Sequence, residues 1–152
     1  MIEIYTDGSC RGNGKKHNVG GYGYAILEND ILIASGGKGE KDTTNNRMEM
    51  LAIIESYNIL KQKELNQNTD IIFITDSSYV VNCLYQKWYH KWLTNNWINS
   101  KNEPVKNKDL WKSIIPLFED KRITFRWVKG HNGNNWNEYV DKIAVKNAED
   151  LK

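Results

Sequence analysis

Two aspartates follow two separate apolar segments of this sequence, each within a similar run of residues. Asp7 stands in Tyr-Thr-Asp-Gly-Ser, and Asp76 stands in Ile-Thr-Asp-Ser-Ser. Glu49 and Asp141 lie at the flanks of the apolar stripes of two expected helices. In open α/β sheets, ligands bind beyond the carboxyl ends of parallel strands. If the two strands are neighbours, we expect the four carboxylates to meet at that edge of the sheet.

Four carboxylates at one place repel one another, so their convergence requires bound cations. Carboxylate and water ligands favour hard divalent cations such as Mg²⁺ or Mn²⁺. No set of cysteines and histidines has the spacing of a zinc site, which excludes a structural zinc. The four acids therefore predict a site for hard divalent cations.

Each acid also has an ordinary structural explanation. Asp7 and the glycine that follows it are typical of a turn, and Asp76 could cap the next helix. Glu49 comes three residues after Asn46, which is the spacing of a capping box. Asp141 could be a solvated helix residue. Taken one at a time, these explanations are the more common ones.

The apolar patterning predicts strands first and helices later in the chain. Short apolar or alternating runs indicate strands, and a period of three to four residues indicates amphipathic helices. The expected strands are residues 2–7, 22–27, 31–35, 71–74 and 123–128, and the expected helices are residues 46–63, 77–84, 87–93, 109–119 and 137–149. Residues 8–21 and 129–137 are expected to be loops.

This order of elements predicts the fold class. The first three strands have short links and should pair antiparallel, whereas the later strands should join in parallel through helical crossovers. The prediction is an α/β fold with a five-stranded mixed sheet flanked by helices.

Size and composition favour one folded domain spanning residues 1–152. The chain has 152 residues, of which 26% are charged and 39% hydrophobic, as is typical of a globular domain. No apolar run approaches the roughly 20 residues of a membrane span, and no leader precedes the first strand. Two cysteines cannot form a disulfide framework, so a reducing, cytoplasmic compartment is expected.

The net charge of +2 hides a basic segment at about residues 85–112. This segment carries six lysines, two acids and four of the six tryptophans. A positive segment with aromatic side chains suits a polyanion whose sugars or bases can pack against the rings. The alternative is a helical hairpin with tryptophan in its core and lysine on its solvated face.

Four motifs resemble type 1 ribonuclease H, and the resemblance covers essentially the whole chain. They are residues 5–13 (Tyr-Thr-Asp-Gly-Ser-Cys-Arg-Gly-Asn), 43–50 (Thr-Thr-Asn-Asn-Arg-Met-Glu-Met), 74–80 (Ile-Thr-Asp-Ser-Ser-Tyr-Val) and 127–131 (Trp-Val-Lys-Gly-His). Asp141 follows ten residues after His131. The match looks close to the free-standing bacterial enzyme and implies the ribonuclease H-like fold.

The resemblance implies an endonuclease that hydrolyses the RNA strand of an RNA/DNA hybrid and leaves 3′-hydroxyl and 5′-phosphate ends. It implies two Mg²⁺ ions roughly 4 Å apart, and Mn²⁺ is expected to substitute because both are hard cations. The metal-binding and catalytic carboxylates would be Asp7, Glu49, Asp76 and Asp141. His131 would assist proton transfer rather than hold metal.

The resemblance also implies contacts to both strands of the hybrid. Asn13, Asn45 and Asn46 match contacts to the RNA strand, where an amide can both donate to and accept from a ribose hydroxyl. Thr44 and Asn107 match a pocket for a phosphate of the DNA strand. Trp88 matches an aromatic side chain that packs on a DNA sugar. These contacts read backbone shape, so little sequence preference is expected.

The chain departs from the family pattern in three places. Residues 93–96 (Leu-Thr-Asn-Asn) replace a stretch that is commonly basic, which predicts weaker and less salt-sensitive binding. Residues 15–18 (Lys-Lys-His-Asn) extend the first loop, and its lysines could restore a backbone contact or be inert. The loop at residues 132–136 also differs.

Two other functions remain open from the sequence. A non-catalytic module that binds RNA/DNA hybrids is disfavoured by the presence of all four carboxylates. A relative that acts on DNA, of the exonuclease or transposase type, is disfavoured by the Thr-Thr-Asn-Asn segment and the tryptophan-rich protrusion. A monomer without an obligate protein partner and without membrane attachment is expected.

Overall fold

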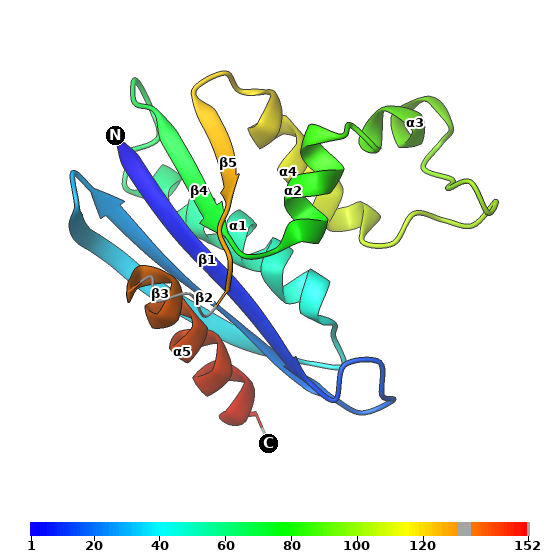
Figure 1. Ribbon diagram of the computed structural model, residues 1–152, viewed down its shortest axis with the longest axis horizontal. Coiled ribbons are helices and arrows are strands. Elements are labelled where there is room, and N and C mark those ends of the chain that lie inside the picture. Colours follow the sequence, from blue (N-terminus) through cyan, green and yellow to red (C-terminus); the bar gives the residue numbers. More distant parts are fainter. Residues whose placement is uncertain (131–134, 152) are drawn as a thin grey trace.

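The computed structural model describes residues 1–130 and 135–151. Five strands form one sheet in the order β3-β2-β1-β4-β5; four of the five helices pack against it and the fifth lies away from it (Figure 1). The strands are β1 (Ile2–Arg11), β2 (Val19–Glu28), β3 (Ile31–Lys41), β4 (Ile71–Thr75) and β5 (Ile123–Trp127). The helices are α1 (Asn45–Gln62), α2 (Ser78–Tyr85), α3 (Tyr89–Thr94), α4 (Lys108–Glu119) and α5 (Asn135–Glu149).

The first three strands form an antiparallel meander, as the sequence predicts. Strands β2 and β3 join through Asn29 and Asp30, whose φ angles of 50° and 68° are both positive. Two such residues make a hairpin turn whose twist matches that of the strands. Strands β4 and β5 pair in parallel with β1 and with each other. The predicted mixed sheet is therefore confirmed.

The prediction of a long first loop was wrong. β1 continues to Arg11 and β2 begins at Val19, so only residues 12–18 connect them. The glycines of this stretch suggested a loop, but Gly20 and Gly21 lie in the ladder opposite Cys10 and Ser9. The last helix likewise begins at Asn135, two residues earlier than predicted.

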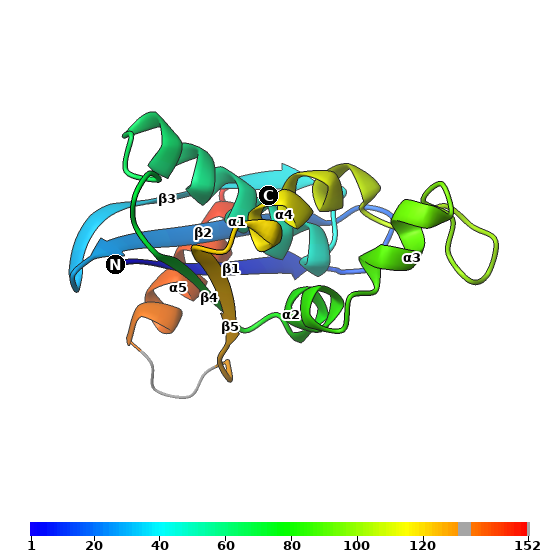
Figure 2. The same ribbon diagram turned by 90° about the horizontal axis from the view of Figure 1, so that it is seen from above.

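Helices cover both faces of the sheet and create two apolar cores. α1 and α4 lie on one side and α5 lies on the other (Figure 2). The larger core joins α1, α2 and α4 to the sheet through side chains such as Met48, Phe73 and Trp111. The smaller core, under α5, includes Tyr5, Ile74 and Val140. Burial of both faces explains why the short strand β4 is almost wholly apolar.

Residues 86–107, with α3 at their start, extend away from the sheet (Figure 1). Trp92 packs between Trp97 and Trp111, with ring centroids 6.1 and 5.8 Å apart. Trp88 instead remains 41% exposed. The basic segment thus has a tryptophan core, as the alternative explanation held, and it also presents an aromatic side chain to solvent.

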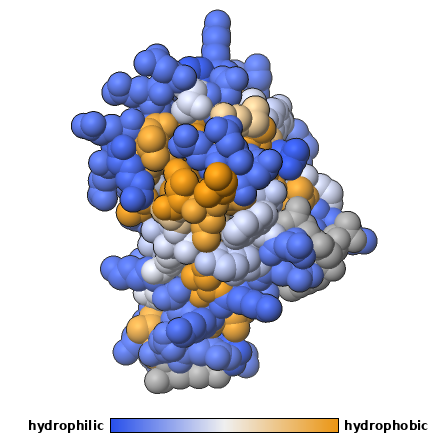
Figure 3. All heavy atoms as spheres, turned by 90° about the vertical axis from the view of Figure 1, so that its left-hand side faces the viewer, coloured by the Kyte–Doolittle hydropathy of each residue, from blue (hydrophilic) through white to orange (hydrophobic). Residues whose placement is uncertain are grey.

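The end of the molecule that carries the β2–β3 turn exposes apolar side chains. Ile31 is 68% exposed and Leu32 is 37% exposed. Figure 3 views this side and shows an apolar area among mostly polar residues. Within residues 1–130 and 135–151, we find no helix with the length and hydropathy that crossing a bilayer requires.

Candidate active site

The end of β4 determines where the carboxylates can meet. Thr6 pairs with Thr75 in the last register position of the parallel ladder between β1 and β4. Asp7 and Asp76 are the next residue on each strand. β1 continues beyond this point without β4 beside it, so its edge is open there. Side chains from both faces of the sheet can therefore reach Asp7.

Glu49 reaches this edge from α1. The helix begins after Thr44, whose Oγ1 accepts a hydrogen bond from the backbone N–H of Arg47 at 3.1 Å. Its first turns lie directly against β1, because a Cβ on Gly8 would overlap the backbone of Met48 and Glu49. The glycine allows the close approach that brings Glu49 beside Asp7.

Three carboxylates converge at this edge. Ligand oxygens of Asp7, Glu49 and Asp76 all lie within 4.8 Å of one another. Asp7 is 4% exposed and Glu49 is 8% exposed. Oε2 of Glu49 is buried without a hydrogen-bond partner among the described residues. A buried oxygen without a partner carries a free-energy penalty that a metal ion would remove.

The pKa values of this group reflect burial and mutual repulsion. Burial, and then the charge of Asp76, raise the pKa of Asp7 from 3.8 to about 8. Burial, followed by the charges of Asp7 and Asp76, raises the pKa of Glu49 well above its usual value. Without a cation, the carboxyl of Asp7 favours its protonated form at neutral pH, and a bound divalent cation would displace that proton. The donor set therefore fits a hard divalent metal.

Asp141 comes to the same site from α5, on the opposite side of the sheet from α1. Its carboxyl interacts with that of Asp7 and raises the pKa of Asp7. It does not belong to the trio of mutually close ligand atoms, and its side chain is half-buried. The structure thus brings all four predicted acids to one region, with Asp7 at the centre.

The segment after β5 packs directly on Asp76. A Cβ on Gly130 would lie 2.8 Å from Oδ2 of Asp76. Nε1 of Trp127 donates a hydrogen bond to the backbone oxygen of Asp76 at 3.1 Å. The end of β5 therefore supports the residue that carries the carboxylate. Trp127 and Gly130 belong to the fourth sequence motif, which predicted a role only for His131.

The ordinary explanations for three acids were wrong. Asp7 and Gly8 lie within β1 and not in a turn. Ser77 caps α2, since its hydroxyl accepts from the backbone N–H of Val80 at 3.3 Å. Glu49 forms no capping box with Asn46, because the N-cap of α1 is Thr44.

A concave region, separate from the carboxylate group, lies beside the first loop and the start of α1. It is an open pocket of about 470 Å³. Five of the six residues predicted to bind substrate line it, together with Gly14 and Lys106; the five are Asn13, Thr44, Asn45, Asn46 and Asn107. Oδ1 of Asn13 accepts a hydrogen bond from the backbone N–H of Asn45 at 3.1 Å, so the loop and the helix are held together.

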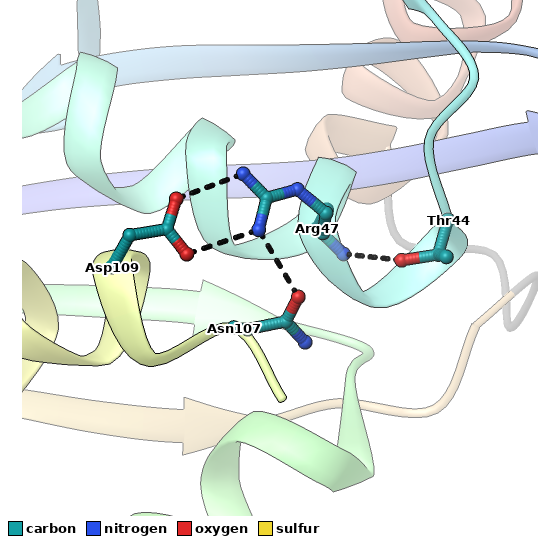
Figure 4. Close-up of polar contacts among 4 residues, drawn as sticks. All are labelled: Thr44, Arg47, Asn107 and Asp109. Carbon is teal, nitrogen blue, oxygen red and sulfur yellow. Dashed lines mark hydrogen bonds and ion pairs between the residues drawn. The ribbon is translucent and has the colours of Figure 1, made fainter. Parts of the chain in front are cut away.

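An arginine that the sequence analysis did not single out fixes one wall of this pocket. Arg47 pairs with both carboxylate oxygens of Asp109 at 3.1 and 3.0 Å, and its Nη1 donates to Oδ1 of Asn107 at 3.2 Å (Figure 4). Since Oδ1 of Asn107 accepts from Arg47, its Nδ2 remains as a donor for an anion. Asn107 itself has a left-handed φ of 62°, a conformation that asparagine tolerates.

Trp88, the sixth predicted substrate residue, lies apart from this pocket. It lines an open pocket of about 450 Å³ on residues 86–100, together with Lys87 and Lys91. Its Nε1 donates to Oε1 of Gln86 at 3.0 Å, which fixes the ring. His131, the predicted proton carrier, lies outside the described residues.

Known proteins of one family match almost the whole length of this chain. A family model described as RNase H matches residues 1–149. Ribonuclease H of Clostridium botulinum is 40% identical over 145 residues, which cover 94% of this chain and 92% of the relative. Ribonuclease HI of Rickettsia conorii is 42% identical over 148 residues, which cover 97% and 91%.

A solved structure is also similar to this one. It is that of LC9-RNase H1, described as a type 1 RNase H with the type 2 active-site motif. The identity is 28% and the TM-score 0.76, over 99% of this chain and 73% of that one.

Proposed function

The chain belongs to the ribonuclease H family of endoribonucleases, and we propose that it hydrolyses the RNA strand of RNA/DNA hybrids. Cleavage would leave 3′-hydroxyl and 5′-phosphate ends. The observation that carries this proposal is the trio of buried carboxylates whose oxygens lie within 4.8 Å of one another.

The metal proposed for this site is Mg²⁺, with Mn²⁺ able to replace it. Asp7, Glu49, Asp76 and Asp141 would hold two ions. Asp7 lies at the centre of this group, since its carboxyl interacts with those of the other three. Bound Mg²⁺ supplies charge neutralisation at the scissile phosphate and lowers the pKa of a bound water.

The protein's own residues position the reacting groups. The carboxylates would fix the reaction at the end of β4, and Trp127 at the end of β5 and Gly130 just after it support Asp76. His131 would carry a proton during the reaction, a function suited to the titration range of imidazole near neutral pH.

Substrate contacts would discriminate hybrids from other duplexes. The amides of Asn13, Asn45 and Asn46 would contact ribose hydroxyls of the RNA strand. Thr44 and Asn107 would bind a phosphate of the DNA strand, and Trp88 would pack on a DNA sugar. All but Trp88 line one pocket. These contacts address sugars and phosphates, so cleavage would depend little on base sequence.

The proposal extends to the organisation of the protein. Residues 1–152 would act as a single domain and a monomer in the cytoplasm, with residues 85–112 as the protrusion that binds the hybrid. Analytical ultracentrifugation of the purified chain measures the oligomeric state, and a dimer at micromolar concentration would contradict the monomer.

The function is tested by incubating the protein and Mg²⁺ with labelled RNA/DNA hybrid, duplex DNA and duplex RNA. We expect cleavage of the hybrid alone. Asp76→Asn should abolish almost all turnover, and His131→Ala should reduce it in part, because metal chemistry survives the loss of a proton carrier. Equal cutting of all three duplexes would overturn the proposal.

The same assay separates the alternative functions. Tight hybrid binding without turnover in Mg²⁺ or Mn²⁺ would identify a non-catalytic hybrid-binding module. Cleavage of the all-DNA duplex would identify a DNA-directed nuclease. In each case the matched control is Asp76→Asn, which keeps the size and packing of the side chain.

A further inference from the structure

A basic pocket lies at the tip of the β1–β2–β3 meander, next to the pocket that Asn13 and Thr44 line. It is open, with a volume of about 510 Å³. Its charged side chains are basic except for Asp42; the lining residues are Arg11, Gly12, Lys15, His17, Asn18, Val19, Lys41 and Asp42. The proposed catalytic residues and hybrid contacts do not include any of them.

The register of the strands gathers the basic side chains. Arg11 and Lys41 both pair with Val19, one on each side of β2. Paired residues in a sheet project to the same face, so the two cations flank one position. Arg11 also pairs with Glu149 of α5, whereas Lys15 and Lys41 have exposed side chains.

The loop that carries Lys15 is fixed by hydrogen bonds. Oδ1 of Asn18 accepts from the backbone N–H of Thr43 at 2.8 Å, and its Nδ2 donates to the backbone oxygen of Lys15 at 3.1 Å. The backbone N–H of Asp42 donates to the oxygen of Asn18 at 2.9 Å. Asn18 thus ties the loop to the junction between β3 and α1. A pocket with a fixed rim loses less entropy when it binds an anion.

The position of the pocket suits a backbone phosphate outside the cleaved linkage. Asp7 and Arg11 are four residues apart in β1 and therefore point to the same face. Four residues of strand span about 13 Å, so this pocket lies beyond the linkage that the carboxylates address.

Taking these observations together, we propose that Lys15 and Lys41, with Arg11, bind a backbone phosphate of the hybrid outside the cleaved linkage. The inference rests on the proposed function, because it takes the hybrid as the polyanion. This contact would compensate for the uncharged residues 93–96 of the protrusion.

The test measures hybrid affinity across a salt series by fluorescence anisotropy. Lys15→Gln/Lys41→Gln is compared with Lys61→Gln/Lys63→Gln, which removes the same charge from exposed positions at the other end of α1. Both pairs are made in an Asp76→Asn background with Mg²⁺, so the hybrid stays intact. Circular dichroism verifies that each variant folds.

We expect the slope of log affinity against log salt to become shallower by about 0.9 for each phosphate that the Lys15/Lys41 variant no longer binds. The Lys61/Lys63 control should keep the parental slope. Equal slopes in the two variants would overturn the inference. Cleavage by the unmodified protein is a separate readout, so failure of this pocket leaves the proposed function standing and failure of cleavage is recognised independently.

A neutral methylphosphonate linkage locates the contact. Placed one position at a time along either strand, it should weaken binding of the Asp76→Asn protein at the contacted phosphate. The same linkage should have no further effect on the Lys15/Lys41 variant. The strand on which the linkage weakens binding of the Asp76→Asn protein, but not of the Lys15/Lys41 variant, is the strand that supplies the phosphate. If no position shows this difference, the inference is wrong.

Discussion

The Asp7 carboxyl makes the stability of the metal-free protein depend on pH. Its pKa of about 8 in the folded protein lies above the ordinary value of 3.8. The folded state therefore retains a proton that the unfolded chain releases as pH rises between these values. Stability is greatest below this interval and falls as pH rises through it.

We predict that the melting temperature in chelator falls from pH 5 to about pH 8, where the carboxyl ionises. Saturating Mg²⁺ should remove most of this fall, because it binds the ionised form. Asp7→Asn should raise the metal-free unfolding free energy by about 2 to 4 kcal/mol at pH 7 while abolishing activity. Calorimetry at several pH values measures both effects, and a profile shared by Asp7→Asn and the parent would contradict the prediction.

Trp127 is predicted to act as a positioning residue for Asp76. Trp127→Phe keeps an aromatic ring and removes the N–H that bonds to the backbone of Asp76. Loss of one such bond is worth about 1 kcal/mol, so Mg²⁺ affinity measured by titration calorimetry should fall about fivefold. Trp88→Phe, on the protrusion, is the matched control and should bind Mg²⁺ as the parent does. Unchanged affinity in Trp127→Phe would assign the indole a packing role alone.

Residue types and motifs predicted that the acids would meet at one edge of the sheet, where the structure brings them together, but the Arg47–Asp109 pair was missed. The two residues are 62 positions apart, and either charge on its own is typical of an exposed helix residue. Only the packing of α4 against α1 makes them partners. Local pattern carries no information on such a contact.

At the scale of elements, the sequence predicted the number and type of helices and strands, and it misjudged the strand lengths. Glycine weakens a strand in isolation, so residues 8–11 and 19–21 were assigned to a loop. In the folded chain, Gly21 and Gly23 lie where α5 crosses β2, and a Cβ on either would overlap that helix. Tertiary packing therefore selects glycine in this strand.

Gly21→Ala should destabilise the protein by about 1 to 3 kcal/mol or more. The added methyl group would meet the backbone of Ala144 and Ala148, which cannot move without shifting α5. Gly36→Ala is the control, because the nearest atom to its methyl group would be the side-chain hydroxyl of Tyr24 at 2.8 Å, and not the backbone of a helix. In urea denaturation, Gly21→Ala should have a much lower free energy of unfolding than Gly36→Ala. The reverse order would contradict the prediction that close packing of α5 requires glycine at position 21.

For the molecule as a whole, hybrid affinity should increase when charge is restored to the protrusion. Leu93 and Thr94 are both exposed there, and Leu93→Lys/Thr94→Lys adds two cations. The salt slope of hybrid binding should steepen by about 0.9 for each additional phosphate that the variant binds. Asn58→Lys/Gln62→Lys on α1 is the charge-matched control. If both variants gain hybrid affinity equally, the gain comes from net charge and not from the position of the lysines on the protrusion, which would contradict the prediction.

The link that Arg47 makes between α1 and the start of α4 has a consequence for engineering. Asn107 and Asp109 stand at the point where the protrusion returns to the domain, and Arg47 holds both. A protrusion exchanged between relatives must therefore bring compatible partners for this arginine. A replaced segment that ends before residue 107 keeps the contacts of Arg47 with Asn107 and Asp109. A segment that replaces these two residues leaves the Arg47 guanidinium without its counter-charge beside the pocket.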